Sequence, residues 1–254
     1  MIMIVMAENY NEQNIHPRDS RINFIPETHT YIIDGCDGRI RSVTEVVAEC
    51  FEKFDEIYWS ERKAAQMGVS AEDLREQWRQ KARQAAQLGV ELHDRIEKYY
   101  QGCDCGADDE AYRLFKMFAS VVRLYPYRTE WRIFDEEYGV AGTLDFLARN
   151  PADGSFEIMD WKRSDRIISD GKAVTESRYG KFGLYPVEHV SDCTYMHYAL
   201  QVSIYRYILE SRYGINVVRG RLGIFHPSYT RPYIVDVPYL RGEAAAVLRH
   251  HSFG

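Results

Sequence analysis

The stretch that decides the fold is residues 141–162, which read AGTLDFLARNPADGSFEIMDWK. Residues 141–149 and 156–161 are short runs rich in apolar, β-branched and aromatic side chains, which is typical of strands. Between them, residues 151–154 read Pro-Ala-Asp-Gly and have the composition of a turn. The stretch therefore predicts an antiparallel hairpin.

The register of this hairpin brings charged residues together. Alternate residues of a strand share a face, so Asp160 and Lys162 point the same way and Trp161 points the other way. If the hairpin is symmetric about its turn, Asp145 lies opposite Asp160 and Thr143 lies opposite Lys162. Two carboxylates and one ammonium then share one patch of the sheet.

A third acid joins the patch when the same register is applied to the preceding turn, around Glu137 and Tyr138. Glu130 then lies across from Asp145, on its other side. Three acids on one sheet repel one another unless a cation lies among them. Hard oxygen ligands suit Mg²⁺ or Mn²⁺ better than zinc, and such an ion can activate a water and stabilise charge on a phosphoryl oxygen. The patch therefore predicts a metal site for phosphoryl chemistry.

The alternative is that these charges are surface decoration. An Asp-x-Lys tripeptide is common, and cross-strand pairs of opposite charge are frequent on solvated sheets. The apolar neighbours Ile158, Met159, Leu144 and Phe146 argue for a site, because charged residues are seldom placed in buried strands without a function.

Outward from the hairpin, the rest of the chain completes an α/β pattern. Ser70, with Asp73 three residues later, predicts a capping box at a helix start. The other expected elements are a hairpin of residues 30–33 and 39–43 around a turn at 34–38, a helix starting at Ser42 or Thr44, a helical section over 55–100 broken at 67–69, a helix at 110–124 ended by Pro126, a strand at 129–134, a loop over 163–192, a strongly amphipathic helix at 194–213, strands at 219–226 and 233–237, and a helix at 242–250.

Bulk composition indicates one soluble domain. With 254 residues and 45% hydrophobic content the chain can bury a sizeable core, and the apolar start at residues 1–7 is too short for a membrane span. Five cysteines show no framework spacing, which favours a reducing cytoplasm.

The net charge of −6 counts against nucleic-acid binding over a broad basic surface. One local stretch is rich in basic residues: Lys162, Arg163, Arg166, Lys172, Arg178 and Lys181. Only three acids lie between them: Asp165, Asp170 and Glu176.

Two helices carry polar residues at matching spacing. Upstream, Gly89, His93 and Glu97 are four residues apart beside an apolar stripe, so His93 lies at the edge of the buried face, where it could reach a metal. Downstream, Gln201 and Tyr205 have the same spacing and could hydrogen-bond a phosphate or hold the lysine. Read separately, each pattern is more typical of a half-buried polar edge than of a site.

Read together, these features form an ordered set: Gly-x-x-x-His, Gly-x-x-Asp, Asp-x-Lys and Gln-x-x-x-Tyr. This order, over residues 40–225, resembles the RecB-like branch of the PD-(D/E)XK nuclease superfamily. Ser42-Val43-Thr44 is also similar to the opening of phage-type members and of the related mitochondrial DNA exonuclease.

The resemblance implies a restriction-endonuclease-like core, a central mixed β-sheet flanked by helices, in one domain. Residues up to about 125 would form the β-hairpin and helical section that contributes His93, and the remainder would form the core. The implied roles are metal ligation by His93, Asp145, Asp160 and the main-chain carbonyl of Trp161, catalysis by Asp145, Asp160 and Lys162, and support near the lysine and the nucleic-acid backbone by Gln201 and Tyr205. Glu130 and Glu97 are supporting residues that rest on geometry.

The sequence departs from the family pattern at two points. Leu144 stands where the family name has proline. Several RecB-like nucleases bind an iron–sulfur cluster through one early and three late cysteines, and here no cysteine follows Cys193. No iron–sulfur cluster is therefore expected, and the cofactor is expected to be Mg²⁺ or Mn²⁺.

The expected function is a metal-dependent DNA exonuclease in recombination, repair or phage DNA metabolism, in the cytoplasm of a bacterial or phage-infected cell. Its expected partners are single- or double-stranded DNA and recombination or replication proteins, with no membrane. Three alternatives stay open: a structure-specific or restriction-like endonuclease, a non-catalytic DNA-binding or assembly protein on a degenerate nuclease fold, and an unrelated α/β protein.

Overall fold

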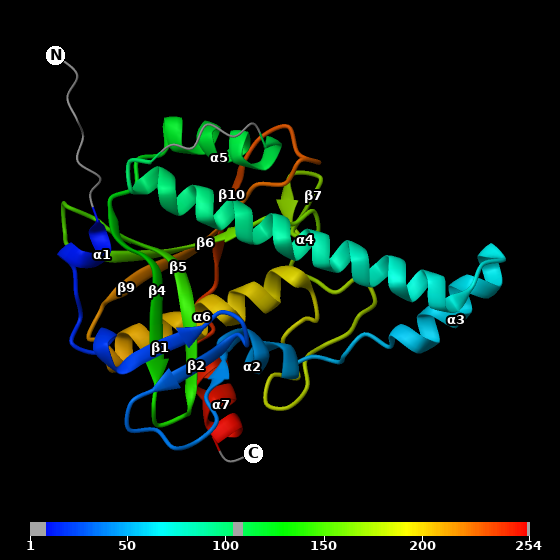
Figure 1. Cartoon of the computed structure of the whole chain (residues 1–254), viewed down its shortest axis with the longest axis horizontal. Coiled ribbons are helices and arrows are strands. Elements are labelled where there is room, and N and C mark those ends of the chain that lie inside the picture. The colour runs from blue at the N-terminus through cyan, green and yellow to red at the C-terminus, as the bar shows by residue number, and fades with distance from the viewer. Residues whose placement is uncertain (1–8, 104–108, 253–254) are drawn as a thin grey trace.

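The computed structural model describes residues 9–103 and 109–252 and has a mixed β-sheet between layers of helices (Figure 1). The strands of this sheet are β3 (Arg41–Ser42), β4 (Pro126–Asp135), β5 (Val140–Arg149), β6 (Phe156–Lys162), β9 (Val217–Ile224) and β10 (Tyr233–Val237). β4, β5 and β6 form an antiparallel meander, β9 runs parallel to β6, and β10 runs antiparallel to β9. The expected α/β class, with a central mixed sheet flanked by helices, is confirmed.

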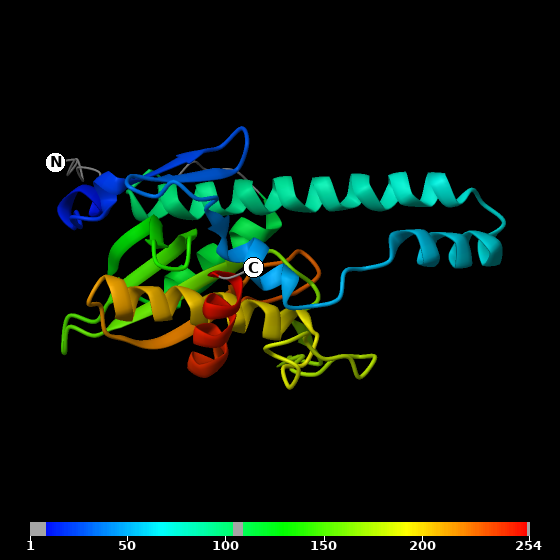
Figure 2. The ribbon, with the colours of Figure 1, turned by 90° about the horizontal axis from the view of Figure 1, so that it is seen from below.

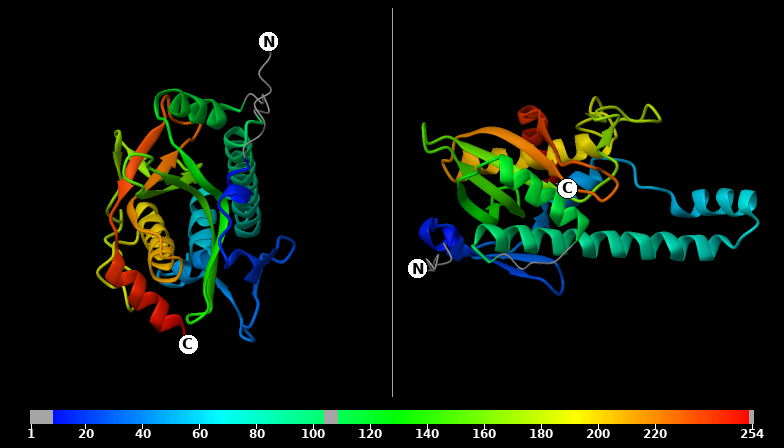
Figure 3. Two further views of the ribbon diagram at one scale, coloured as in Figure 1. Left: turned by 90° about the vertical axis from the view of Figure 1, so that its left-hand side faces the viewer. Right: turned by 90° about the horizontal axis from the view of Figure 1, so that it is seen from above.

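Helices cover both faces of the sheet (Figure 3). On one face lie α2 (Val43–Glu49), α6 (Thr194–Arg212) and α7 (Arg241–Ser252), and on the other lie α4 (Ala71–Tyr100) and α5 (Glu110–Val121). α6 is the crossover that parallel pairing of β6 and β9 requires. Each face buries its own apolar cluster, so α4 and α6 approach the same strands from opposite sides.

A helical arm projects beyond the sheet (Figure 2). It consists of α3 (Glu56–Met67) and the first half of α4, which lie antiparallel. Gly68, at a φ of +67°, ends α3 in the left-handed conformation, where glycine is favoured, and the Ser70 hydroxyl accepts a hydrogen bond from Asp73 N that caps α4. The helix break and the cap expected from the sequence are confirmed.

The expected hairpin of residues 30–43 is wrong. β2 (Thr30–Ile33) pairs instead with β1 (Ile22–Ile25), and β3 joins the main sheet, parallel to the start of β5. The reason is burial: Tyr31 and Ile33 pack with Ile22 against Phe134 and Ala141, which a pairing with residues 39–43 would not cover.

Three further expectations need correction. Pro126 begins β4 instead of ending a helix, because α5 already ends at Val121. The loop over 163–192 contains a small hairpin of β7 (Ile168–Ser169) and β8 (Lys172–Ala173). α6 is buried on most of its circumference, packed between the sheet, α2 and α7, so it is not strongly amphipathic.

The short helices α1 (Tyr10–Gln13) and η1 (Asp19–Arg21) precede β1. Within residues 9–103 and 109–252 no helix is both long and apolar enough to cross a membrane. The apolar start of the chain, residues 1–7, lies outside the described residues, as does Cys105.

Candidate metal centre

The candidate site is an opening between β5 and β6. The ladder that joins them runs from Arg149↔Phe156 to Phe146↔Met159, in the register expected from a symmetric hairpin, and stops there. β4 pairs along the other edge of β5, so β3 and β6 share the edge that faces the opening. β3 pairs only with the first two residues of β5. Residues 142–145 therefore have no strand neighbour on this edge. The expected pairings of Asp145 with Asp160 and of Thr143 with Lys162 lie beyond the ladder and do not form.

Asp145 bridges the opening. Its Oδ2 accepts a hydrogen bond of 2.7 Å from Trp161 N, which takes the place of a ladder bond. The Asp145 side chain is 10% exposed, and Oδ1 is left facing α4. The splayed strands are thus held together by a carboxylate that still has one oxygen directed at the site.

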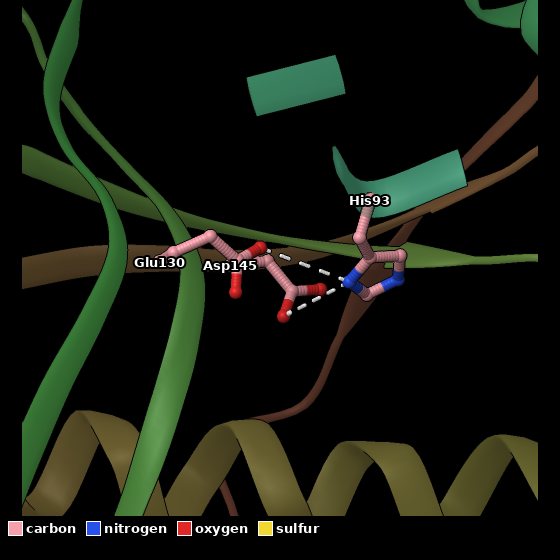
Figure 4. Close-up of side chains that lie close together, drawn as sticks. All are labelled: His93, Glu130 and Asp145. Carbon is pink, nitrogen blue, oxygen red and sulfur yellow. Dashed lines mark ion pairs between the residues drawn. The ribbon is translucent and has the colours of Figure 1, made fainter. Parts of the chain in front are cut away.

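His93 reaches this carboxylate from α4 (Figure 4). Nε2 donates to the carbonyl of Trp161 at 2.8 Å, while Nδ1 lies 3.6 Å from Asp145 Oδ1 and 3.8 Å from Glu130 Oε1. Because a carbonyl only accepts, Nε2 carries the proton, and in the neutral ring Nδ1 presents its lone pair to two carboxylates. That arrangement is repulsive unless a proton or a metal ion lies between them.

The ligand atoms of His93, Glu130 and Asp145 all lie within 4.8 Å of one another, so these three residues could hold a metal ion. Glu130 lies opposite Asp145 in the β4–β5 register, as expected, since Thr129 pairs with Phe146 and Trp131 with Leu144. Its φ of +44° is rare for a residue with a Cβ and breaks the ladder there.

Burial raises the pKa of Glu130 well above its ordinary value, and the nearby Asp145 and Glu97 carboxylates raise it further. Glu130 nevertheless keeps 31% of its side-chain surface exposed, so the site is reachable from outside. The site is therefore short of positive charge, which a divalent cation would supply.

Asp160 lies on the α6 side of the opening. It is fully buried, and burial raises its pKa to about 6 despite the opposing effect of Lys162, with Asp145 adding to the rise. Gln201 Nε2 donates to Oδ1 at 3.4 Å. Lys162 Nζ lies 2.6 Å from Oδ2, so the lysine ammonium and this buried carboxylate form an ion pair.

Lys162 stays protonated in this setting. Burial by itself would lower its pKa, but the Asp160 and Asp145 carboxylates outweigh burial and raise the pKa above the ordinary value for lysine. The ammonium also lies 4.4 Å from the ring centroid of Tyr198, on α6. The sequence did not point to Tyr198, which is one turn of helix before Gln201. Several tyrosines lie in that segment, and no feature of the sequence distinguishes Tyr198 from the others.

The remaining expected residues surround the centre. Tyr205 accepts a hydrogen bond from Gln201 at 3.4 Å and is buried. A Cβ at Gly142 would lie 2.6 Å from Tyr205 Cε1, so glycine is required for α6 to approach the opening. Glu97 lies one turn beyond His93, where Thr129 Oγ1 donates to it at 3.5 Å, and it is outside the three-residue cluster.

The sequence also missed Tyr31. Its hydroxyl lies 3.0 Å from Thr143 Oγ1, which links the β1–β2 hairpin to the unpaired part of β5. No signal within residues 30–33 indicates this contact, because it depends on the pairing of β2 with β1.

Comparisons with known proteins leave the family of this chain open. No family model matches, and no curated protein matches. The crystal structure of SSO0001 is similar over 84% of this chain and 75% of that chain, with 19% identity and a TM-score of 0.35. That score is too low to establish a shared fold.

Proposed function

We propose that the chain is a metal-dependent DNA nuclease of the PD-(D/E)XK kind. One observation carries the proposal: His93, Glu130, Asp145, Asp160 and a protonated Lys162 converge on one opening of the sheet from α4, β4, β5 and β6. The order of these residues in the chain, and the position of a mixed sheet between helices, support it.

The donor set fits Mg²⁺ or Mn²⁺. His93 Nδ1 and carboxylate oxygens of Glu130 and Asp145 would be ligands, and Asp160, which is paired with Lys162, would join them from the α6 side of the opening. The Trp161 carbonyl accepts a hydrogen bond from His93 and retains a second lone pair for a metal. Carboxylate-rich sites with one imidazole suit these ions better than thiolate-binding metals.

The bound ion would supply Lewis acidity and a hydroxide-like water at neutral pH. Lys162 places a fixed positive charge where negative charge develops on the phosphoryl oxygens. Gln201 holds the Asp160 carboxylate, and Trp161 N holds Asp145, so the acids keep their geometry during the reaction. Water attacks phosphorus in line, and the 3′-oxygen leaves.

Cleavage of single- and double-stranded DNA with Mg²⁺ or Mn²⁺ tests the proposal. We expect chelation to abolish cleavage and Lys162→Ala to reduce its rate by about 100-fold or more, because a preorganised positive charge is lost. Asp94→Asn is the matched control, because Asp94 neighbours His93 but pairs with Lys98 on the exposed side of α4. Cleavage that survives both the chelator and Lys162→Ala would contradict the proposal.

The proposed mode of cleavage is exonucleolytic, which rests on the resemblance to phage-type enzymes. Closed circular DNA separates the two modes, because an exonuclease leaves it intact and an endonuclease opens it. Calorimetry with Mn²⁺ addresses the non-catalytic alternative: DNA binding without any metal binding would favour an assembly protein on this fold.

A further inference from the structure

The segment from Arg163 to Asp192 leaves β6 directly after Lys162 and returns to the start of α6 (Figure 2). It is anchored by main-chain hydrogen bonds, from Gly183 N to Val190 O at 2.8 Å and from Leu184 N to Cys50 O at 2.7 Å. The segment therefore holds a defined shape between β6 and α6, although it contains only the short β7–β8 hairpin.

Three aromatic rings of this segment face solvent. Tyr179 is 78% exposed, Phe182 is 54% exposed and Tyr185 is 68% exposed. Large apolar side chains grouped on an anchored segment are typical of a binding surface. They lie within seven residues of one another.

The same segment carries several basic side chains, most of which have no acidic partner among the described residues. In the part of the chain that the structure describes, Arg163, Arg166, Lys172 and Arg178 form no ion pair, unlike Lys181, which pairs with Glu52 at 2.7 Å. Over residues 163–181 five basic residues face three acidic ones, whereas the whole chain carries −6. The positive charge is thus local to the segment that follows Lys162 in the chain.

Unpaired cations and exposed rings together match the chemistry of a single nucleic-acid strand. Phosphates pair with guanidinium and ammonium groups, and unpaired bases stack on aromatic rings. In a duplex the bases stack on each other, and the rings would have no partner. A protein partner would suit the rings but would leave the cations without phosphates.

We propose that residues 163–185 bind a single strand of DNA and deliver it to the centre at Lys162, so that single-stranded DNA is the preferred substrate. Bases stack on Tyr179, Phe182 and Tyr185, and phosphates pair with Arg163, Arg166, Lys172 and Arg178. The delivery rests on the proposed nuclease function, but the binding does not.

Fluorescence anisotropy in EDTA, where no cleavage occurs, measures the affinity for a labelled 20-nucleotide strand and for the matching duplex. The aromatic variant is Tyr179→Ala/Phe182→Ala/Tyr185→Ala, and the basic variant is Arg166→Gln/Lys172→Gln/Arg178→Gln. The matched control is Arg123→Gln/Tyr125→Ala, a basic and aromatic pair with the Arg123 guanidinium 5.1 Å from the Tyr125 ring, outside the segment. Thermal melting verifies that each variant is folded.

We expect the wild type to prefer the single strand, and the aromatic variant to bind it at least about tenfold more weakly, with little change for the duplex. The basic variant should lower the slope of log affinity against log salt by about 2, because three phosphate contacts at about 0.7 each are lost. The control should match the wild type.

Single-strand affinity within twofold of the wild type for both variants, or a wild-type preference for duplex, would overturn this inference. If the wild type cleaves DNA with metal while the variants keep full affinity, only the inference fails. If the wild type binds the single strand through these residues but neither binds Mn²⁺ nor cleaves, the nuclease function fails and the inference about binding stands.

Discussion

At the scale of single residues, one hydrogen bond to the Trp161 carbonyl orients His93 in the candidate site. The Trp161 carbonyl holds Nε2, so Nδ1 must face Asp145 and Glu130. The backbone of β6 thereby sets the tautomer of a side chain on α4. A partner of this kind commonly orients metal-ligating histidines.

Glu130→Gln should raise the stability of the metal-free protein and reduce the additional stabilisation that Mn²⁺ confers. The neutral amide removes a buried charge from an acidic cluster, so in EDTA the free energy of unfolding should rise by about 1 kcal/mol or more. It also removes a ligand, so the stabilisation that Mn²⁺ confers should fall. Thermal melting with and without Mn²⁺ measures both effects; a variant less stable than the wild type in EDTA would refute the idea that Glu130 is strained by its neighbours.

At the scale of elements, α6 approaches β5 closely beside the opening between β5 and β6. Gly142 allows this approach, because a Cβ there would meet the Tyr205 ring at 2.6 Å. Gly89, the other glycine of the sequence motif, has no atom within 4 Å of a Cβ added to it, so no contact in the structure requires it. The two glycines look alike in the sequence and differ in their surroundings.

Gly142→Ala and Gly89→Ala should therefore act in opposite directions. Gly142→Ala should destabilise the fold by about 1–3 kcal/mol, because β5 or the buried Tyr205 ring must shift. Gly89→Ala should stabilise it by up to about 1 kcal/mol through helix propensity in α4. Urea denaturation of both variants gives the comparison, and equal effects would show that α6 does not constrain β5.

At the scale of the whole molecule, the arm and the sheet core differ in burial. α3 buries only Ser60 and Ala64, whereas α6 buries ten residues between the sheet and its neighbouring helices. His93 lies on the half of α4 that packs on the core, so the arm can open without disturbing the centre.

Amide hydrogen exchange should reveal this difference. We expect amides of α3 to exchange much faster than those of α6, because little apolar surface opposes local opening of the arm. The second half of α4, around Leu92 and Ile96, should be protected like α6, since both side chains are buried. Uniform protection along α4 and α3 would show that the arm unfolds only with the core.

Much of the site could be predicted because it depends on local rules. Turn composition and strand alternation predicted the registers of β4, β5 and β6, and helix spacing placed His93 and Gln201 on the correct faces. The pairing of β2 with β1 could not be predicted. It depends on burial of the β2 side chains against Phe134 and Ala141, which are more than a hundred residues away in the sequence. Tyr198 and Tyr31 join the site only through such non-local packing.

The sequence by itself determined the elements and the acid–lysine hairpin, since turn chemistry and side-chain period act within a few residues. Only the tertiary structure decided that the ladder stops before Asp145, because β3 pairs with the start of β5 and Trp161 N donates to the Asp145 side chain. That interruption leaves carboxylate oxygens free to face His93 and makes the hairpin a candidate metal centre.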